Sequence, residues 1–102
     1  MGEFFKVEVE WDATKAEVNL RKHGVSFGSA ATILRDPLAV ATPDEAYGDT
    51  EERWITIGRT PTGECLLVVH TWVELEANSA KARIISARKA ENSERKQYEE
   101  GL

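Results

Sequence analysis

The sequence predicts a single α+β domain over residues 1–102, in which helices cover a small antiparallel β-sheet. A length of 102 residues suits one domain rather than two. Two segments with the apolar spacing of helices follow a first strand, and several strand-like segments then succeed one another before a short, charged, helical segment. Because successive strands joined by tight turns pair as an antiparallel meander, the order predicts two N-terminal helices, a sheet and a short C-terminal helix.

The first three elements have boundaries that can be read from the sequence. FKVEVEW, residues 5–11, alternates apolar and polar side chains and predicts a half-buried strand. Asp12 can cap a first helix, which Gly24 can end in the left-handed conformation. Ser26 can cap a second helix, and Asp36-Pro37 ends it. The predicted apolar stripe of this second helix consists of Phe27, Ala30, Ala31 and Leu34.

The second half of the chain predicts strands. A polar loop without periodicity follows the first of them, and Thr60-Pro61-Thr62-Gly63 predicts a hairpin turn. ELEANSA, residues 74–80, predicts a loop or the end of a hairpin. Asn92 or Ser93 can cap the last helix, which ends near Gly101. The predicted strands are residues 38–42 (LAVAT), 53–60 (RWITIGRT), 65–72 (CLLVVHTW) and 81–88 (KARIISAR).

Composition argues against several classes of protein. No apolar run approaches the length of a membrane span, and the charged N-terminus lacks the apolar core of a signal peptide, so we expect a cytoplasmic protein that does not contact the membrane. The single cysteine, Cys65, lies in an apolar run and is best explained as a small buried hydrophobic residue. No spacing typical of metal ligands is present, so we expect neither metal nor cofactor.

The charge is unevenly distributed. The net charge is −5, yet residues 81–98 contain six basic and two acidic side chains, whereas residues 36–52 contain six acidic and no basic ones. Such a separation predicts a basic surface for an anionic partner and an acidic loop elsewhere. The structural alternative is two solvated surfaces.

Arginines on strands are the main candidates for chemistry. On RWITIGR, Arg53 and Arg59 share a face with two isoleucines, while Trp54, Thr56 and Gly58 share the other. Arg83 shares a face with Ile85. Arginines aligned with core residues need an ion-pair partner or a function, and guanidinium groups bind phosphate in a bidentate way. The structural alternative is salt bridges to acids such as Glu8, Glu10, Glu51 or Glu52.

Three further side chains have both structural and functional interpretations. Lys22 and His23 precede Gly24, where cations favour the negative end of a helix dipole, but they could also face an anionic substrate. His70, late in an apolar strand, is better explained as a core histidine with one hydrogen bond.

Arg83 and Arg88 are an odd number of residues apart, so a regular strand would point them to opposite faces.

Four segments together resemble the BrnT family of toxins. They are EWDATKAEVNLRKHGVSF, ERWITIGRT, LLVVHT and RIISARKA with the later ERKQYEE, and they span about residues 10–101. The resemblance implies a fold similar to RelE and ParE. It also implies an endoribonuclease toxin of a type II toxin–antitoxin system, neutralised by a BrnA-like antitoxin with a ribbon-helix-helix domain. The complex would repress its own promoter, binding DNA only through the antitoxin, and can contain a toxin homodimer.

The resemblance also implies candidate site residues. The expected reaction is metal-independent attack of a ribose 2′-hydroxyl on the adjacent phosphate. Arg59 and Arg83 would stabilise the phosphorane, while His23 or Lys22 would assist proton transfer or hold the RNA backbone. One arginine of Arg83 and Arg88 would serve the catalytic face and the other an antitoxin contact. Contacts to RNA or to the partner are expected from Arg53, His70, Arg88 and Lys89.

Two alternatives remain open from the sequence. The chain could be a non-catalytic module that binds an antitoxin and acts only in repression, in which case the arginines would bind acidic antitoxin side chains. It could also poison DNA gyrase as ParE does, because a shared fold does not fix function.

Overall fold

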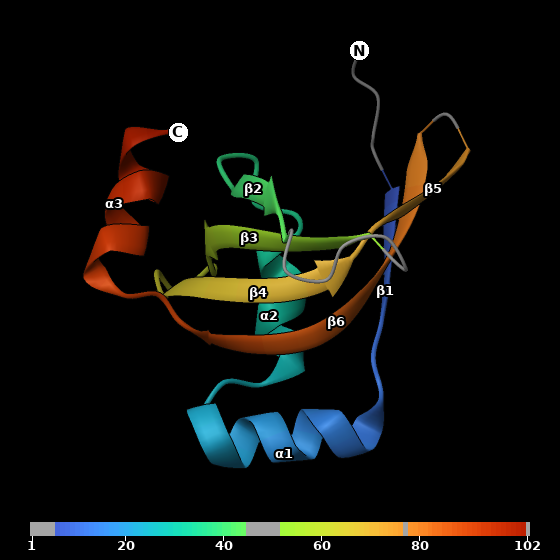
Figure 1. The fold of residues 1–102 in the computed structure, drawn as a ribbon, viewed down its shortest axis with the longest axis horizontal. Coiled ribbons are helices and arrows are strands. Elements are labelled where there is room, and N and C mark those ends of the chain that lie inside the picture. The colour runs from blue at the N-terminus through green and yellow to red at the C-terminus, as the bar shows by residue number, and fades with distance from the viewer. Residues whose placement is uncertain (1–5, 45–51, 77, 102) are drawn as a thin grey trace.

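The computed structural model describes residues 6–44, 52–76 and 78–101. It confirms the α+β class, with two helices after the first strand and a short C-terminal helix (Figure 1). No helix within these ranges is long and apolar enough to cross a bilayer. Most of the predicted polar loop before residue 53 lies outside the described residues. The elements are β1 (Lys6–Glu10), α1 (Ala13–His23), α2 (Phe27–Ile33), β2 (Val40–Pro43), β3 (Arg53–Arg59), β4 (Cys65–Thr71), β5 (Val73–Glu76), β6 (Ser79–Lys89) and α3 (Asn92–Glu100).

The sheet is mixed rather than wholly antiparallel. Its order is β1-β6-β4-β3-β2, and β5 also pairs with β6. The pairs from β2 through β3 and β4 to β6 are antiparallel, as the sequence predicted. β1, in contrast, pairs with β6 in parallel, with Lys6 opposite Ser79 and Glu10 opposite Arg83. The prediction was wrong at this edge because β1 leads into two helices rather than a tight turn, and a long connection permits parallel pairing.

β6 is the strand that connects the two parts of the sheet. It has 11 residues and curves from the hairpin with β5 to the connection with α3 (Figure 1). Its first half pairs with β1 and β5, and its second half with β4. The sequence predicted only a loop or hairpin end where β5 lies, and all four residues of this short strand are exposed.

The helix ends follow local side-chain chemistry. Asp12 accepts a hydrogen bond from the Lys15 amide at 2.9 Å, and Gly24 is left-handed with a φ of 71°. Ser26 caps α2, so these three predictions are confirmed. The cap of α3 is Glu91, one residue before the predicted Asn92 or Ser93. Its carboxylate and that of Glu94 form a reciprocal capping box, which satisfies amide groups of the first turn.

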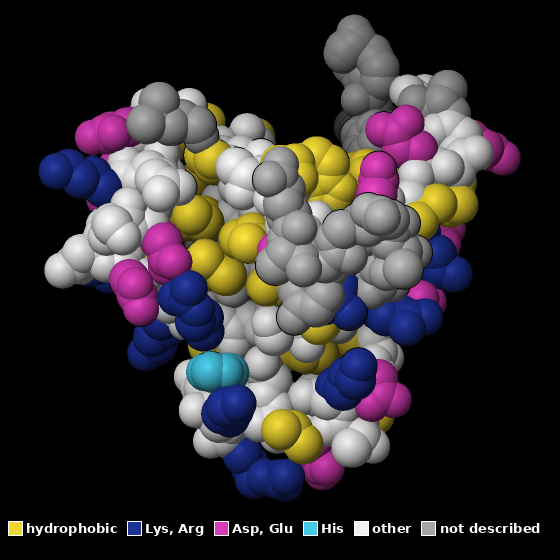
Figure 2. Space-filling model, in the orientation of Figure 1, with side chains coloured by type: hydrophobic (Ala, Val, Ile, Leu, Met, Phe, Trp, Pro, Cys, Tyr) yellow, Lys and Arg dark blue, Asp and Glu magenta, His cyan; other side chains and the backbone are white. Residues whose placement is uncertain are grey.

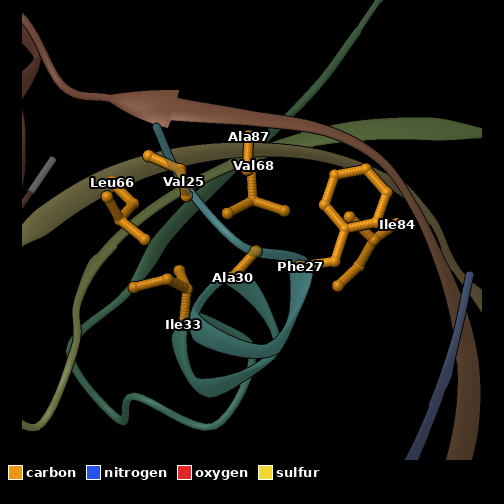
Figure 3. Close-up of a cluster of buried hydrophobic side chains, with 8 residues drawn as sticks. All are labelled: Val25, Phe27, Ala30, Ile33, Leu66, Val68, Ile84 and Ala87. Atoms are coloured by element: carbon orange, nitrogen blue, oxygen red, sulfur yellow. The ribbon is translucent and has the colours of Figure 1, made fainter. Parts of the chain in front are cut away.

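The main core lies between α2 and one face of the sheet (Figure 3). Phe27 and Ala30 of the predicted stripe are buried, but the third buried position on α2 is Ile33 rather than Leu34. β4, which lies between β3 and β6, is apolar through its middle, as expected for a central strand. The buried cluster consists of Val25, Phe27, Ala30, Ile33, Leu66, Val68, Ile84 and Ala87.

The opposite face of the sheet, called the open face below, is covered by α3 at one end only. Tyr98 of α3 and Ala90 pack there on Ile57 and Leu67. Cys65 packs against the same cluster and is partly buried, consistent with its interpretation as a small hydrophobic residue. Burial raises the pKa of its thiol. The remainder of the open face is therefore the part of the sheet that no helix covers.

Candidate functional site

The open face carries the arginines that the sequence singled out. In the β3–β4 register Arg53 is opposite Thr71, Ile55 opposite Val69, and Arg59 opposite Cys65. Directly opposed residues share a face of the sheet. Along β4, the residues opposite Arg53, Ile55 and Arg59 alternate with Leu66 and Val68, which are buried in the main core, so the arginines lie on the other face. The predicted alternation along β3 is therefore confirmed. Figure 2 shows hydrophobic side chains between α3 and the β5 side of the molecule, with Lys and Arg side chains on both flanks.

A β-bulge places Arg83 and Arg88 on the same face, which corrects the parity prediction. Val69 is opposite Ser86, but His70 is opposite Ile84, so β6 carries one extra residue at this point. Because Ile84 points into the core beneath α2, Arg83 points to the open face. Arg88 is opposite Leu67, which packs against α3 on that same face. The extra residue in β6 shifts the alternation by one.

Arg59 and Arg83 lie at opposite ends of the open face. Arg59 is at the Cys65 end of β3, whereas the amide of Arg83 donates to the Thr71 hydroxyl at 2.9 Å at the other end. A strand of seven residues spans roughly 20 Å. One phosphate group therefore cannot contact both guanidinium groups in this structure. The structure does not bring these two residues together as a pair.

The Arg83 end of the open face holds several charged side chains around a hollow. Glu10 of β1 accepts ion pairs from Lys81 Nζ and from Arg83 Nε, both at 3.5 Å. Arg53, opposite Thr71, continues this row across the sheet. The hollow has a volume of about 230 Å³ and is called the Glu10 pocket below. It is lined by Glu10, Glu52, Thr71, Val73, Lys81 and Arg83.

The cations of the Glu10 pocket are open to solvent. The Arg83 side chain is 64% exposed, and ion pairs at such exposure contribute little to stability. The Arg83–Glu10 pair is one of the salt bridges that the sequence offered as a structural explanation. Two cations, Lys81 and Arg83, and two carboxylates, Glu10 and Glu52, line the pocket, so its formal charge is balanced, and the exposed Arg83 guanidinium keeps N–H groups that can bind a phosphate.

The Arg59 end is a network that joins three elements. The Arg59 guanidinium lies 5.3 Å from the centre of the Tyr98 ring and 3.3 Å from Glu99, a partner that the sequence did not indicate. The Tyr98 hydroxyl donates to Asp36 at 2.8 Å, and the Arg59 amide donates to the same oxygen. The hydrogen bond to Asp36 is the main cause that raises the pKa of Tyr98. Arg59 thus has a structural role in holding α3 on the sheet.

Arg88 and Lys89 differ in how tightly they are held. Arg88 forms two hydrogen bonds to Glu94, at 2.9 and 2.8 Å. This bidentate pair is the largest cause that lowers the pKa of Glu94. Lys89 is 68% exposed and lies 4.0 Å from Glu64. Arg88 is therefore fixed as the anchor of the first turn of α3, whereas Lys89 remains accessible.

His70 is buried, as its structural interpretation required. It is 2% exposed, and its Nδ1 lies 2.8 Å from the Thr71 carbonyl, while Nε2 lies 2.6 Å from the Thr56 hydroxyl. A carbonyl only accepts, so Nδ1 carries a proton, and in the neutral ring Thr56 donates to Nε2. Burial lowers the pKa of His70, which favours that neutral form. His70 also borders a mostly apolar hollow of about 280 Å³ with Trp54 and Trp72, on the face away from Arg83.

Lys22 and His23 lie in the last turn of α1, on the surface. The buried residue one turn earlier is Asn19, whose side chain bonds to Val25 and to both backbone groups of Ala87 on β6. Lys22 and His23 are thus at the Ala87 side of the sheet rather than beside Glu10. The structure brings them neither to Arg83 nor to the Glu10 pocket.

Sequence reasoning missed five residues that line the Glu10 pocket as site residues. Glu10 and Glu52 were considered only as salt-bridge partners, Lys81 only as part of the basic stretch, and Thr71 and Val73 not at all. The period of two on β1 and β6 was a usable signal, because Lys81 and Arg83 necessarily share a face. The parallel register that brings Glu10 beside them could not be inferred from that period.

Comparison with known proteins gives a consistent result. The family described as "Ribonuclease toxin, BrnT, of type II toxin-antitoxin system" matches residues 11–94. The crystal structure of the Brucella abortus ribonuclease toxin BrnT superposes with a TM-score of 0.60 at 21% identity, covering 85% of this chain and 100% of that chain. No curated protein matches the sequence. At that identity the structural likeness shows a shared fold.

Proposed function

Because this chain belongs to the BrnT family of ribonuclease toxins from type II toxin–antitoxin systems, we propose that it is an endoribonuclease that cleaves RNA without a metal ion. The ribose 2′-hydroxyl attacks the adjacent phosphorus, and the 5′-oxygen of the next nucleotide leaves. The products are a 2′,3′-cyclic phosphate and a 5′-hydroxyl. The pentacoordinate phosphorane formed on the way carries extra negative charge, so the enzyme has to supply positive charge next to it.

The observation that carries this proposal is the Glu10 pocket on the open face. Arg83 lines it with Lys81, and Arg53 lies in the same row of the sheet. Guanidinium groups bind two phosphate oxygens at once. Arg83 is the group that we assign to the phosphorane, because it is mostly exposed and its backbone is held by pairing with β1 on one side and by the Thr71 hydroxyl on the other.

The other cations are proposed to hold the RNA backbone at a distance from the reacting phosphate. Arg59 lies at the far end of the open face, several nucleotides away from Arg83, whereas Lys89, opposite Leu66, lies near that end on the other face of the sheet. Lys22 and His23, exposed at the end of α1, are proposed as a further backbone contact on that side. His70 is buried, and we assign it to the fold rather than to RNA binding.

The proposed partner is a BrnA-like antitoxin with a ribbon-helix-helix domain. A type II system implies a protein antitoxin, and acidic side chains of that partner would pair with the exposed arginines of the open face. We propose that the complex, which can contain a toxin dimer, binds promoter DNA only through the antitoxin and represses transcription. Arg53 and Arg88 would contribute to the antitoxin contact.

The test uses end-labelled RNA and purified protein free of antitoxin, in excess EDTA, with and without ribosomes. Wild type, Arg83→Ala, Arg59→Ala and the control Arg21→Ala are compared after circular dichroism shows that each is folded. Arg21 is an exposed cation on α1, away from the open face. We expect cleavage to cyclic-phosphate ends by wild type and Arg21→Ala, a large loss in Arg83→Ala and a smaller loss in Arg59→Ala.

Two outcomes would contradict the proposal. Intact RNA in every reaction with folded wild type would leave a non-catalytic antitoxin-binding module, or a gyrase poison that a DNA supercoiling assay would reveal. Full activity in Arg83→Ala would remove the assigned role of the Glu10 pocket. Cleavage that needs ribosomes would keep the reaction and define its substrate.

A further inference from the structure

We propose that Glu10 and Lys81 are the proton acceptor and the proton donor of the cleavage reaction, with Arg83 beside them as the phosphate ligand. This inference rests on the proposed ribonuclease function and assigns roles within its site. It differs from the roles expected for His23 and Lys22, which lie away from this pocket.

The strand pairing holds the three side chains together. In the parallel register Glu10 is opposite Arg83 and Glu8 is opposite Lys81. Lys81 and Arg83 are two residues apart on β6, so their side chains project from the same face. Glu10 Oε1 lies 3.5 Å from Lys81 Nζ, and Oε2 lies 3.5 Å from Arg83 Nε. Each side chain thus projects from a hydrogen-bonded strand, which gives a catalytic group a fixed position.

Glu10 is accessible to a substrate from two sides. Glu10 and Arg83 line the Glu10 pocket and also a second hollow of about 300 Å³, which Trp11 and Asp12 complete. The side chain of Glu10 is 44% exposed. Trp11 offers a ring at the rim of the second hollow, on which an RNA base can stack. A phosphate at Arg83 would therefore place its ribose beside the carboxylate.

The ion pairs of Glu10 are looser than the structural pair of the same chain. Arg88 donates two hydrogen bonds to Glu94, at 2.9 and 2.8 Å, and the Glu94 carboxylate also accepts the Glu91 amide. The contacts of Glu10 are both 3.5 Å long, which leaves lone pairs of the carboxylate for another donor. A carboxylate that is oriented but not saturated is suited to accept the proton of a 2′-hydroxyl.

The proton balance closes within this group. Glu10 takes the proton of the 2′-hydroxyl as the new 2′-oxygen–phosphorus bond forms. Lys81 gives a proton to the 5′-oxygen as its bond to phosphorus breaks, while Arg83 neutralises charge on the two non-bridging oxygens. The neutral Lys81 amine then takes the proton from the Glu10 carboxylic acid, 3.5 Å away. No oxidant, reductant or metal ion takes part.

The first test compares Glu10→Gln with Glu17→Gln, which removes an exposed carboxylate of α1 outside the Glu10 pocket. We expect a fall of at least about 100-fold in the rate of RNA cleavage for Glu10→Gln, a typical cost of removing a general base. Glu17→Gln should stay close to wild type. Binding of a 2′-O-methyl RNA, which cannot react, should not be weakened in Glu10→Gln, because the substitution removes a negative charge beside Arg83 and affects the chemical step alone.

The pH dependence separates a proton acceptor from a structural role. The charged groups facing Glu10 are Lys81 and Arg83 on β6, Glu52 across the pocket and Asp12 at the second hollow. The wild-type rate should fall as the pH is lowered, because a protonated Glu10 cannot accept. That acid limb should be absent from the residual activity of Glu10→Gln and present in Glu17→Gln.

A modified substrate tests Lys81 separately. An RNA with sulfur in place of the leaving 5′-oxygen has a leaving group that departs without a proton. Lys81→Ala should cleave the normal RNA at least about 100-fold more slowly than wild type, and the sulfur-containing RNA at nearly the wild-type rate. Glu10→Gln should not be rescued, because its defect is at the attacking oxygen.

The failure of this inference can be told apart from the failure of the ribonuclease function. Wild-type cleavage together with full activity or a retained acid limb in Glu10→Gln overturns the role of Glu10 and leaves the function intact. Absence of sulfur rescue in Lys81→Ala overturns the role of Lys81. No cleavage by folded wild type, with or without ribosomes, overturns both the function and the inference.

Discussion

Tyr98 of α3 donates its hydroxyl proton to Asp36, which lies just after α2, over an O–O distance of 2.8 Å. The same carboxylate oxygen accepts the Arg59 amide at 2.8 Å, and the other oxygen accepts the Leu38 amide at 3.0 Å. One carboxylate thereby joins the end of α2, the end of β3 and the C-terminal helix. Because α3 covers the second core cluster at this point, Asp36 couples the helix to the sheet.

The first prediction concerns acid stability through Asp36. Burial alone would raise its pKa, but the hydrogen bonds from Arg59, Leu38 and Tyr98 outweigh that effect, and the pKa is lowered. The native state therefore binds fewer protons than the unfolded chain in this range. The stabilisation is fully present above the unfolded pKa, near 4, and is lost as pH falls through the folded value.

We expect Asp36→Asn to lower the free energy of unfolding by about 1–2 kcal/mol at pH 7. The further decrease in the free energy of unfolding between pH 5 and pH 2 should be smaller than in wild type. Urea unfolding followed by tryptophan fluorescence at a series of pH values measures both. Glu17→Gln, an exposed acid on α1, serves as the control. An acid dependence in Asp36→Asn equal to that of wild type would contradict the prediction.

The second prediction concerns His70, whose lowered pKa results from burial. The unfolded chain protonates this histidine at a higher pH than the native state does. Stability should therefore decline as the pH falls through about 6.5 and level off below the folded pKa. His70→Gln should lose this part of the pH dependence.

Thr56→Val provides the matched variant for His70. It removes the hydroxyl that contacts Nε2 at 2.6 Å but keeps the imidazole. We expect it to lower the free energy of unfolding by about 1 kcal/mol while the decline between pH 7 and pH 5 persists. Unfolding curves that show the same decline in His70→Gln would rule out His70 as its source.

The third prediction concerns Asn19, the one buried residue of α1. Its side chain donates to the carbonyls of Val25 and Ala87 at 3.0 and 2.9 Å and accepts from the Ala87 amide at 3.2 Å. Asn19→Ala leaves buried backbone groups without partners, so we expect a loss of about 2–4 kcal/mol. Val18→Ala, at a residue that is 45% exposed, should cost less than about 0.5 kcal/mol. Chemical denaturation of both variants checks this, and similar losses would refute it.

The fourth prediction compares two glycines. A Cβ at Gly58 would lie 2.8 Å from Ile33 Cγ2 and 3.1 Å from Asp36 Oδ2, so Gly58→Ala should destabilise the fold by about 1–3 kcal/mol. A Cβ at Gly28, which lies in α2, would be 3.8 Å from the Ser26 Oγ and would meet nothing closer. Gly28→Ala should therefore stabilise the fold by up to about 1 kcal/mol. Thermal melts of the two variants should shift in opposite directions. A Gly58→Ala protein as stable as wild type would show that α2 is free to move away from β3.

Local sequence rules predicted much of the fold. Asp12, Gly24 and Ser26 mark the helix ends because each acts on backbone groups within four residues. The alternation along β3 predicted that Arg53 and Arg59 share a face. The apolar middle of β4 identified the central strand. The family match over residues 11–94 confirms the resemblance that EWDATKAEVNLRKHGVSF and the later segments carry.

The candidate site was predicted in part. The sequence singled out Arg83 and offered Glu10 as a salt-bridge partner, and the structure pairs them. The sequence also grouped Arg59 with Arg83, although the register places them at opposite ends of the open face. The sequence of a single strand does not show its register relative to the neighbouring strand.

The sequence by itself determined the helices, the strands other than β5, the caps of the first two helices and the residues that share a face within each regular strand, because these depend on contacts between near neighbours in the chain. Only the tertiary structure decided the parallel pairing of β1 with β6 and the extra residue in β6. No glycine marks this bulge in the sequence, yet it moves Arg83 to the face of Arg88. The meeting of Glu10, Lys81 and Arg83 depends on packing between segments far apart in the chain, and that packing is a property of the whole fold.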